Sequence, residues 1–407
     1  MTSDGGDLPA RFAELWASLL PIGLAESGGY RRFAWTDTDR RLREWFRGQA
    51  TDRGLSYEVD RNGNQWAWLG EPAAGAVVTG SHLDSVPDGG AYDGPLGIVS
   101  AFLAVDELRA SGVAVRRPVA IVNFADEEGA RFGVACVGSR LLAGLLAPDA
   151  ARALTDAAGG SLGAALTHGG VDPSRIGRDD AAIARIGAFV ELHIEQGRCL
   201  ADSAAAVGVA TAIWPHGRWL FAFTGEPNHA GTTQLADRRD PMLPFAMTVV
   251  AARAFAAALD ALATFGKVHV VPNATNGIPS AVRGWLDLRA PDEELLDAAL
   301  QRITDAARTA AAAHSVEVAV TTESRTAAVQ FDETLRDRIA HSLGGVPLLP
   351  TGAGHDAGIL STVAPTAMLF VRNNSGVSHS PAEQADDADC LAGVGALAAV
   401  LADLAAR

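Results

Sequence analysis

The sequence is poor in cysteine. Its 407 residues include three, Cys136, Cys199 and Cys390, which lie far apart and form no C-x-x-C pair. An odd number of scattered cysteines argues against a disulfide framework and against a zinc site built from thiolates. Because such a chain gains nothing from an oxidising compartment, we expect it to work in the reducing cytoplasm.

Positive charge and long apolar runs are also scarce. Lysine and arginine total 33 against 48 acidic residues, for a net charge of −15. No basic stripe is therefore available to neutralise the phosphates of a nucleic acid or an anionic membrane. We see no apolar stretch of about 18 residues that would cross a membrane. The first residues, MTSDGGDLPARFAELW, carry acids and lack the apolar segment of a signal peptide.

Two common nucleophile patterns are absent as well. The chain reads G-S-H around Ser81, without the G-x-S-x-G context of a serine nucleophile, and no cysteine has a visible activating partner. What is present is a composition of 48% hydrophobic and 20% charged residues, which is typical of a globular protein with an ample core. The length predicts more than one domain.

The first stretch that suggests chemistry is TGSHLDSVPDGGAYDGPLG, residues 79–97. It follows the apolar residues 76–78 and precedes a helical pattern, so it lies at the carboxyl end of a predicted strand, where open α/β sheets form their sites. His82 can supply a ring nitrogen to a metal ion, Asp84 can orient that ring, and Asp93 can bind one ion or bridge two. A Gly-rich loop with these residues is also compatible with ordinary turn chemistry.

A second acidic cluster follows another predicted strand. Residues 118–124 are almost wholly apolar, as in a strand covered on both faces, and Asp126, Glu127 and Glu128 come directly after. Adjacent carboxylates can divide their roles, one binding a metal ion and the other moving protons. Two neighbouring glutamates can equally form a solvated loop edge, but their position after a buried strand favours a site.

Further histidines stand in similar positions. Glu191, His193 and Glu195 alternate with apolar residues in ELHIEQG, which places them on one face of a strand. Two later loops rich in small residues carry one histidine each, His355 in GAGHDA and His379 in GVSHSPAE. Either loop alone could be an ordinary turn, but with the earlier clusters they add imidazole groups to a site.

Residues 211–324 have the pattern of a separate unit. Strands are predicted at 218–224, 265–271, 281–290 and 316–322, and helices at 240–262 and 293–314. This β-α-β-β-α-β order is the ferredoxin-like pattern. We therefore predict an α/β chain whose first domain, residues 1–210 and 325–407, is interrupted by an inserted ferredoxin-like domain at 211–324.

The inserted unit carries polar residues that a binding site could use. His229 lies in the loop GEPNHAGTT, Asn276 lies in NATNGIPS, and Arg289 shares a strand face with Asp287. Each can be an ordinary surface residue. Together they could hold a carboxylate, to which an arginine offers paired donors.

The clusters combine into one candidate metal site with three imidazoles and two carboxylates. Its members are His82, Asp93, Glu128, His193 and His379. If Asp93 bridges two ions, open positions remain for water and substrate. Two ions roughly 3.5–4 Å apart would acidify a shared water and polarise a carbonyl, leaving Glu127 to move the proton. Such ligands suit Zn, Mn, Ni or Co.

The motifs quoted above, together with DEEGARF, occur in order over residues 79–383. With them the chain resembles the metal-dependent amidohydrolase family of allantoate amidohydrolases, N-carbamoyl-L-amino-acid hydrolases and β-ureidopropionases, within the dinuclear zinc peptidase superfamily. The related peptidases typically carry an acidic ligand where this chain has His193, so the resemblance points to the ureido-cleaving branch. Where the family often reads HAGTTPM, this chain has Gln234-Leu235, which leaves the substrate within that branch open.

The resemblance implies a role for each residue. One ion would be held by His82, Asp93 and His193, and the other by Asp93, Glu128 and His379. Glu127 would be the general base and Asp84 would orient His82. The substrate would be bound by Gln196, His229, Asn276, Arg289 and His355.

The resemblance also implies a dinuclear-zinc-peptidase-like catalytic domain and a homodimer formed through the inserted lid domain, whose His229 and Asn276 could reach the partner's active site. The reaction would hydrolyse a linear ureido C–N bond of allantoate or an N-carbamoyl-L-amino acid, releasing ammonia and CO2. The alternative enzyme is an N-acyl-amino-acid or dipeptide hydrolase on the same scaffold. A non-catalytic binding protein is a third reading, which the complete ligand set disfavours. Zinc or manganese is the expected metal, with nickel and cobalt left open.

Overall fold

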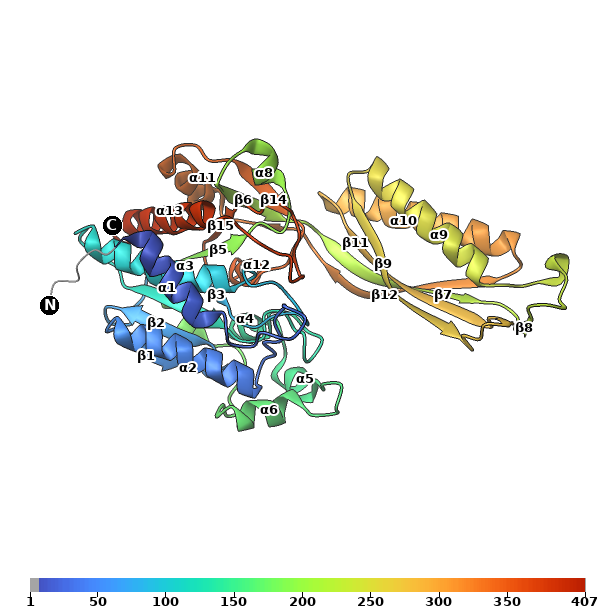
Figure 1. The fold of residues 1–407 in the computed structure, drawn as a ribbon, viewed down its shortest axis with the longest axis horizontal. Helices are drawn as coiled ribbons and strands as arrows, with labels where there is room; N and C mark the ends of the chain where they lie inside the picture. The colour runs from blue at the N-terminus through green and yellow to red at the C-terminus, as the bar shows by residue number, and fades with distance from the viewer. Residues whose placement is uncertain (1–6, 407) are drawn as a thin grey trace. The chain divides into compact units, whose positions relative to one another are not determined.

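The computed structural model describes residues 7–406. The prediction about a signal peptide rests in part on residues 1–6, which lie outside that range. The chain separates into two compact units (Figure 1). Unit 1 combines the residues up to Thr211 with those from Gln330 onward, and unit 2 comprises Ala212–Val329.

Unit 1 is built on a nine-stranded mixed sheet of order β1-β2-β4-β3-β5-β15-β6-β13, with β14 beside β6 (Figure 1). The strands are β1 (Ser56–Val59), β2 (Gln65–Leu69), β3 (Ala76–His82), β4 (Val119–Phe124), β5 (Ile186–Ile194), β6 (Val207–Ile213), β13 (Val329–Gln330), β14 (Leu348–Thr351) and β15 (Thr366–Val371). The central strands β4, β3, β5 and β15 are parallel neighbours. Their carboxyl ends therefore meet at one edge of the sheet.

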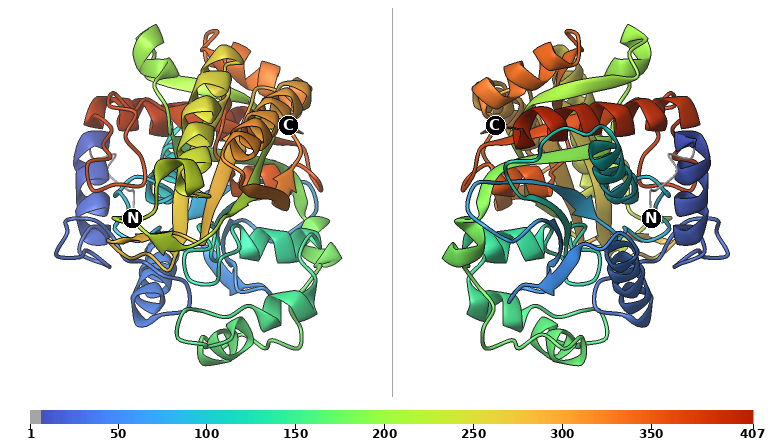
Figure 2. Two further views of the ribbon diagram at one scale, coloured as in Figure 1. Left: turned by 90° about the vertical axis from the view of Figure 1, so that its right-hand side faces the viewer. Right: turned by 90° about the vertical axis from the view of Figure 1, so that its left-hand side faces the viewer.

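The helices of unit 1 cover this sheet. They are α1 (Leu8–Leu19), α2 (Asp37–Asp52), α3 (Pro95–Ala110), α4 (Val137–Ala143), α5 (Pro148–Ala153), α6 (Leu162–His168), α7 (Asp180–Ile183), α8 (Cys199–Ser203), α11 (Glu333–Ser342), α12 (Asp356–Leu360) and α13 (Asp387–Ala405). Helices α3 and α13 lie side by side and contact β3 (Figures 1 and 2). Their apolar side chains join those of the strands in the largest hydrophobic core, which fixes the central strands beneath the site.

Helix α13 corrects one expectation from the sequence. Its 19 residues are long and apolar enough, by composition, to cross a membrane, although no such stretch was expected. Half of its most apolar window is buried in unit 1, where Leu397 and Leu401 are fully covered. Asp387 and Asp389 lie in its first turn and Asp403 near its end, so the uncharged run read from the sequence is shorter than about 18 residues.

Unit 2 has a four-stranded antiparallel sheet of order β12-β7-β11-β9. Its elements are β7 (His216–Thr224), β8 (Asn228–His229), the short 3₁₀ helix Leu235–Asp237, α9 (Met242–Ala258), β9 (Leu262–Val271), β10 (Gly277–Ile278), β11 (Ala281–Arg289), α10 (Glu293–Ala313) and β12 (Glu317–Thr326). Helices α9 and α10 pack against each other, and Phe221, Phe223 and Ile303 belong to the core between helices and sheet.

The ends of two elements in unit 2 differ most from the predicted ones. The last strand continues to Thr326 rather than ending at 322, because a bulge between Thr322 and Ser324 lets β12 stay paired with β7. Helix α9 ends at Ala258, before the predicted end at 262, because Leu262 already pairs with Arg289 in the sheet. Neither the bulge nor the long-range pairing is visible in local sequence periodicity.

Candidate metal and active site

The predicted site residues of unit 1 gather at the carboxyl ends of the parallel strands. His82 is the last residue of β3, and His193 is the last residue but one of β5. Glu127 and Glu128 follow β4, and His379 follows β15. The fold brings them together because these four strands are neighbours in the sheet.

Asp93 lies at the centre of this group. Its Oδ1 is 3.5 Å from His82 Nε2 and 3.1 Å from His193 Nε2. Its Oδ2 is 3.2 Å from His379 Nε2, which is 3.8 Å from Glu128 Oε2. The residues thus form two groups, His82–Asp93–His193 and Asp93–Glu128–His379, each with ligand atoms within 4.8 Å of one another. Asp93 belongs to both groups.

The hydrogen bonds of the two buried histidines define which nitrogen faces Asp93. His82 Nδ1 lies 3.1 Å from the carbonyl oxygen of Asp84, and His193 Nδ1 lies 2.8 Å from that of Ile194. A carbonyl only accepts, so each neutral ring carries its hydrogen on Nδ1 and turns the Nε2 lone pair toward Asp93. Neither Nε2 has a hydrogen-bond partner among residues 7–406. Lone pairs that face a carboxylate at this distance repel unless a cation lies between them, so the residues fit a metal ion.

The electrostatics of the site agree with this fit. Burial raises the pKa of Glu127 well above its ordinary value, and burial followed by the charge of Asp93 raises the pKa of Glu128 to about 7. Burial disfavours the charged form of His82, but the nearby carboxylates of Glu127, Asp84 and Asp93 outweigh it and raise its pKa well above normal, so that with no cation bound a proton on Nε2 stands where a metal ion would lie. Several carboxyl groups thus share one buried space, and bound cations would relieve their mutual repulsion.

Asp84 connects two loops rather than acting only on His82. Its carboxylate Oδ1 is 3.6 Å from His82 Nδ1, whereas the backbone carbonyl oxygen of Asp84 is 3.1 Å from the same nitrogen. The carbonyl oxygen is therefore the group that holds the His82 ring. The carboxylate instead accepts hydrogen bonds from the backbone N–H groups of Glu127 and Glu128, at 3.2 and 3.0 Å. Asp84 therefore sets the position of the loop that carries both glutamates.

Gln196 joins the same cluster. Its side-chain nitrogen donates to Asp93 Oδ2 at 2.8 Å and to Ser378 Oγ at 3.1 Å. Ser378 Oγ donates to Glu383 Oε2 at 2.9 Å, and Glu383 Oε1 accepts from the backbone N–H of Asp93 at 3.0 Å. The sequence assigned no role to Glu383, although it ends the motif GVSHSPAE, because nothing local links it to a residue 290 positions earlier.

His355 lies behind His193, with the two ring centroids 4.5 Å apart. Burial, reinforced by His193, lowers the pKa of His355 well below its ordinary value, which keeps its ring neutral. The polar residues in β5 and directly after it have different partners. Glu191 accepts from Ser81 Oγ at 2.7 Å and from the backbone of Ala357, whereas Glu195 accepts from the first backbone N–H groups of α8. His193 is the member of that strand face that reaches Asp93.

The predicted substrate-binding residues of unit 2 lie in two places, near opposite ends of strand β11. His229 pairs with Gly277 in the β8–β10 ribbon, next to Asn276, whose carbonyl accepts from Ala230. Arg289 is the last residue of β11, and its Nε donates to Asp287 Oδ1 at 2.8 Å. The ribbon adjoins the opposite end of that nine-residue strand, which spans roughly 26 Å. Unit 2 therefore brings His229 and Asn276 together and keeps Arg289 apart from them.

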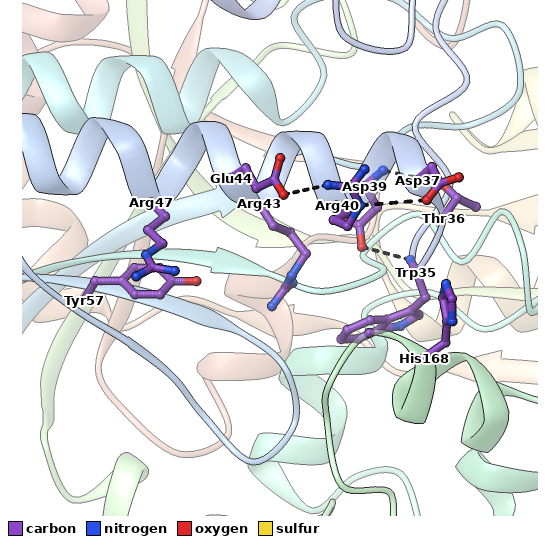
Figure 3. Close-up of a pocket in the computed structure, with 11 residues that line it drawn as sticks. Trp35, Thr36, Asp37, Asp39, Arg40, Arg43, Glu44, Arg47, Tyr57 and His168 are labelled. Atoms are coloured by element: carbon purple, nitrogen blue, oxygen red, sulfur yellow. Dashed lines mark hydrogen bonds and ion pairs between the residues drawn. The ribbon is translucent and has the colours of Figure 1, made fainter.

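A cavity of about 210 Å³ lies elsewhere in unit 1, along α2 (Figure 3). Its lining, within residues 7–406, includes none of the predicted site residues. The arginines there are already engaged: Arg40 pairs with Glu44, and Arg43 lies over the Trp35 ring and donates to a backbone carbonyl. We therefore place no part of the active site in this cavity.

The chain is similar to known proteins over most of its length. The family model described as peptidase family M20/M25/M40 matches residues 78–403. An N-carbamoyl-L-amino acid amidohydrolase of Geobacillus stearothermophilus is 36% identical, over 93% of this chain and 95% of that protein. An allantoate amidohydrolase of Escherichia coli is 32% identical, over 95% and 96%. A solved structure of a hydantoinase/carbamoylase-family amidase from Burkholderia multivorans superposes with a TM-score of 0.87 at 30% identity, covering 98% of each chain.

Proposed function

This chain belongs to peptidase family M20/M25/M40, and from that premise we propose that it is a metal-dependent hydrolase of a linear ureido C–N bond. The substrate is allantoate or an N-carbamoyl-L-amino acid, the compounds named for its relatives. Water attacks the ureido carbon, the C–N bond breaks, and the carbamate that forms decomposes. One water is consumed, and ammonia, CO2 and the amine are released.

The observation that carries this proposal is the arrangement around Asp93. Two buried imidazole lone pairs face its Oδ1, and His379 faces its Oδ2. One metal ion would be held by His82, Asp93 and His193, and a second by Asp93, Glu128 and His379. When bound, the ions supply Lewis acidity, which lowers the pKa of a water and polarises a carbonyl. Zinc and manganese suit these ligands best in our proposal, and the donor set also accepts nickel or cobalt.

Glu127 performs the proton transfer in this proposal. Its carboxylate is 6% exposed and faces the group from the loop after β4. It accepts a proton from the attacking water and passes it to the leaving nitrogen. Gln196 and His355 border the reacting group, and Arg289 supplies paired donors to the substrate carboxylate, provided that it exchanges its contact with Asp287.

We propose a homodimer formed through unit 2, which we assign as an inserted ferredoxin-like lid and dimerisation domain. The spatial strand order β12-β7-β11-β9 supports that assignment. So do the positions of the two helices, which follow β7 and β11, the first and third of these strands along the chain. Because Arg289 and His229 lie at opposite ends of β11, one small substrate does not reach both in one copy. We propose that His229 and Asn276 enter the active site of the partner subunit, where they stabilise charge on the carbonyl oxygen. The cytoplasmic setting remains a prediction from the sequence.

The decisive test is a substrate panel. Metal-loaded protein is incubated with allantoate, several N-carbamoyl-L-amino acids and the matching N-acetyl amino acids, with a chelator-treated sample as control. Metal-dependent ammonia from either ureido class supports the proposal and names the substrate. Release of amino acid from the N-acetyl compounds, with no ammonia from any ureido compound, would instead establish the acyl-amide alternative.

A further inference from the structure

Glu127 is held at three points by residues from two other segments. Its backbone N–H donates to Asp84 Oδ1 at 3.2 Å, and its carbonyl oxygen accepts from the backbone N–H of Cys136 at 2.6 Å. Its side-chain Oε1 lies 3.4 Å from Cys136 Sγ, within hydrogen-bond distance for a thiol donor. Backbone and side chain of Glu127 thus both contact Cys136, nine residues later in the chain.

The two carboxylate oxygens of Glu127 have different surroundings. Oε1 receives the thiol of Cys136, whereas Oε2 lies 3.7 Å from His82 Nε2 and so faces the metal-ligand group. A carboxylate fixed only at its backbone could turn about its terminal torsion, which is broad and roughly two-fold. A donor on one oxygen distinguishes the two and selects one orientation.

The surroundings of Cys136 favour a protonated thiol that donates a hydrogen bond over a reactive thiolate. It is 3% exposed and has a left-handed backbone, φ 56°, directly before α4. Burial, reinforced by the charges of Glu127 and Asp356, raises the pKa of the Cys136 thiol well above its ordinary value. The thiol therefore keeps its proton, and a protonated, buried thiol is a poor nucleophile.

We propose that Cys136 is a positioning residue for Glu127: its thiol donates to Oε1 and leaves Oε2 as the oxygen that exchanges the proton with water and leaving group. This inference rests on the proposed function, because it assumes that Glu127 transfers the proton. It assigns no chemistry to the sulfur itself. The contribution is confined to the orientation of the base, so it should act on turnover and leave substrate affinity unchanged.

Kinetics of three cysteine variants test the inference. Cys136→Ala removes the donor, Cys136→Ser restores a donor, and Cys390→Ala creates a comparable gap at a buried cysteine in α13. We expect Cys136→Ala to lower kcat about threefold to tenfold, with KM and metal content unchanged. Cys136→Ser should recover part of that loss. Cys390→Ala should keep the kcat of wild type. Equal kcat for Cys136→Ala and wild type overturns the inference, as does a loss that appears in KM or metal content.

The S–H stretching band provides a readout that does not depend on activity or on folding of the Cys136 variants. Difference spectra of Cys199→Ala and Cys390→Ala against wild type assign the bands of those two thiols, the remaining band belongs to Cys136, and Glu127→Ala is then measured. We expect the Cys136 band to move to higher frequency when its acceptor is removed. An unmoved band overturns the inference. If wild-type protein releases no ammonia from any ureido substrate, the proposed function fails on its own, and the band still decides whether the thiol donates to Glu127.

Discussion

The Asp84 carboxylate accepts a hydrogen bond from the backbone N–H of Glu127 at 3.2 Å, and its second oxygen accepts from Glu128 at 3.0 Å. This contact joins the loop after β3 to the loop after β4. Asp84 is 4% exposed, so the contact is shielded from water. The loop with the proposed base and one proposed ligand is thereby fixed relative to His82, the ligand two residues before Asp84.

Asp84→Asn should disturb this connection without changing the size of the side chain. An amide offers one oxygen, and its NH2 group would face a backbone N–H, which leaves a buried donor unpaired. We expect a loss of about 1–3 kcal/mol in the free energy of unfolding and a fall of about 10- to 100-fold in metal affinity, measured by denaturant unfolding and metal titration. Asp180→Asn, on a side chain 78% exposed, is the control. Equal values for both variants would remove Asp84 from the organisation of the site.

Glu127→Gln separates proton transfer from binding. The amide keeps the shape of the side chain and can still accept a hydrogen bond from Cys136, but it does not take up a proton from water. We expect kcat to fall by about 10²–10⁴-fold while metal content and substrate binding stay close to wild type. Glu128→Gln offers the contrast, because it should lower metal content. Wild-type turnover by Glu127→Gln would refute the assignment of the base.

Gly94→Ala tests the packing beneath His82. Gly94 has φ 83°, and a Cβ atom there would lie 2.4 Å from His82 Cε1. The backbone strain alone costs about 1–2 kcal/mol. Gly112→Ala shares that strain at φ 69° but has no atom within 4 Å of the added carbon. We expect Gly94→Ala to lose metal affinity and to be less stable than Gly112→Ala. Matching metal titrations for the two variants would show that the His82 ring tolerates displacement.

The positions of the metal-ligand candidates could be predicted from the sequence because each follows a strand pattern. His82, His193 and Glu128 come at or just after apolar runs, and the carboxyl ends of parallel strands meet at one edge. The choice of nitrogen in each imidazole could not be predicted, since it depends on the carbonyl groups of Asp84 and Ile194. Tautomers are set by three-dimensional contacts and not by residue type.

The residues that support the site were largely missed for the same reason. Glu383 reaches the backbone of Asp93 across 290 positions, and Cys136 reaches Glu127 through the turn of a tight loop. Arg289 shows the opposite case. Alternate residues of a strand share a face, so its contact with Asp287 could be foreseen from the spacing of the two residues.

Subunit mixing tests the proposal that His229 acts across a dimer. His229→Ala and Glu127→Gln are each expected to be nearly inactive. In a hybrid dimer, one site would combine both defects and the other would have neither. Random exchange of equal amounts should therefore restore about one quarter of wild-type activity, as expected for a two-fold symmetric assembly. No recovery in a mixture whose subunits have demonstrably exchanged would show that His229 acts within its own subunit.

The measurement that tests the central claim most directly is metal content against ammonia release. Wild-type protein is stripped with a chelator and titrated with Zn²⁺ or Mn²⁺, while bound metal per chain and ammonia from the preferred ureido substrate are followed in the same samples. The account predicts no ammonia from stripped protein and full activity only as a second ion per chain is bound, with Asp93→Asn failing to retain either ion tightly. Full ammonia release by metal-free protein would contradict it. So would an Asp93→Asn variant that binds metal with wild-type affinity and reaches full activity.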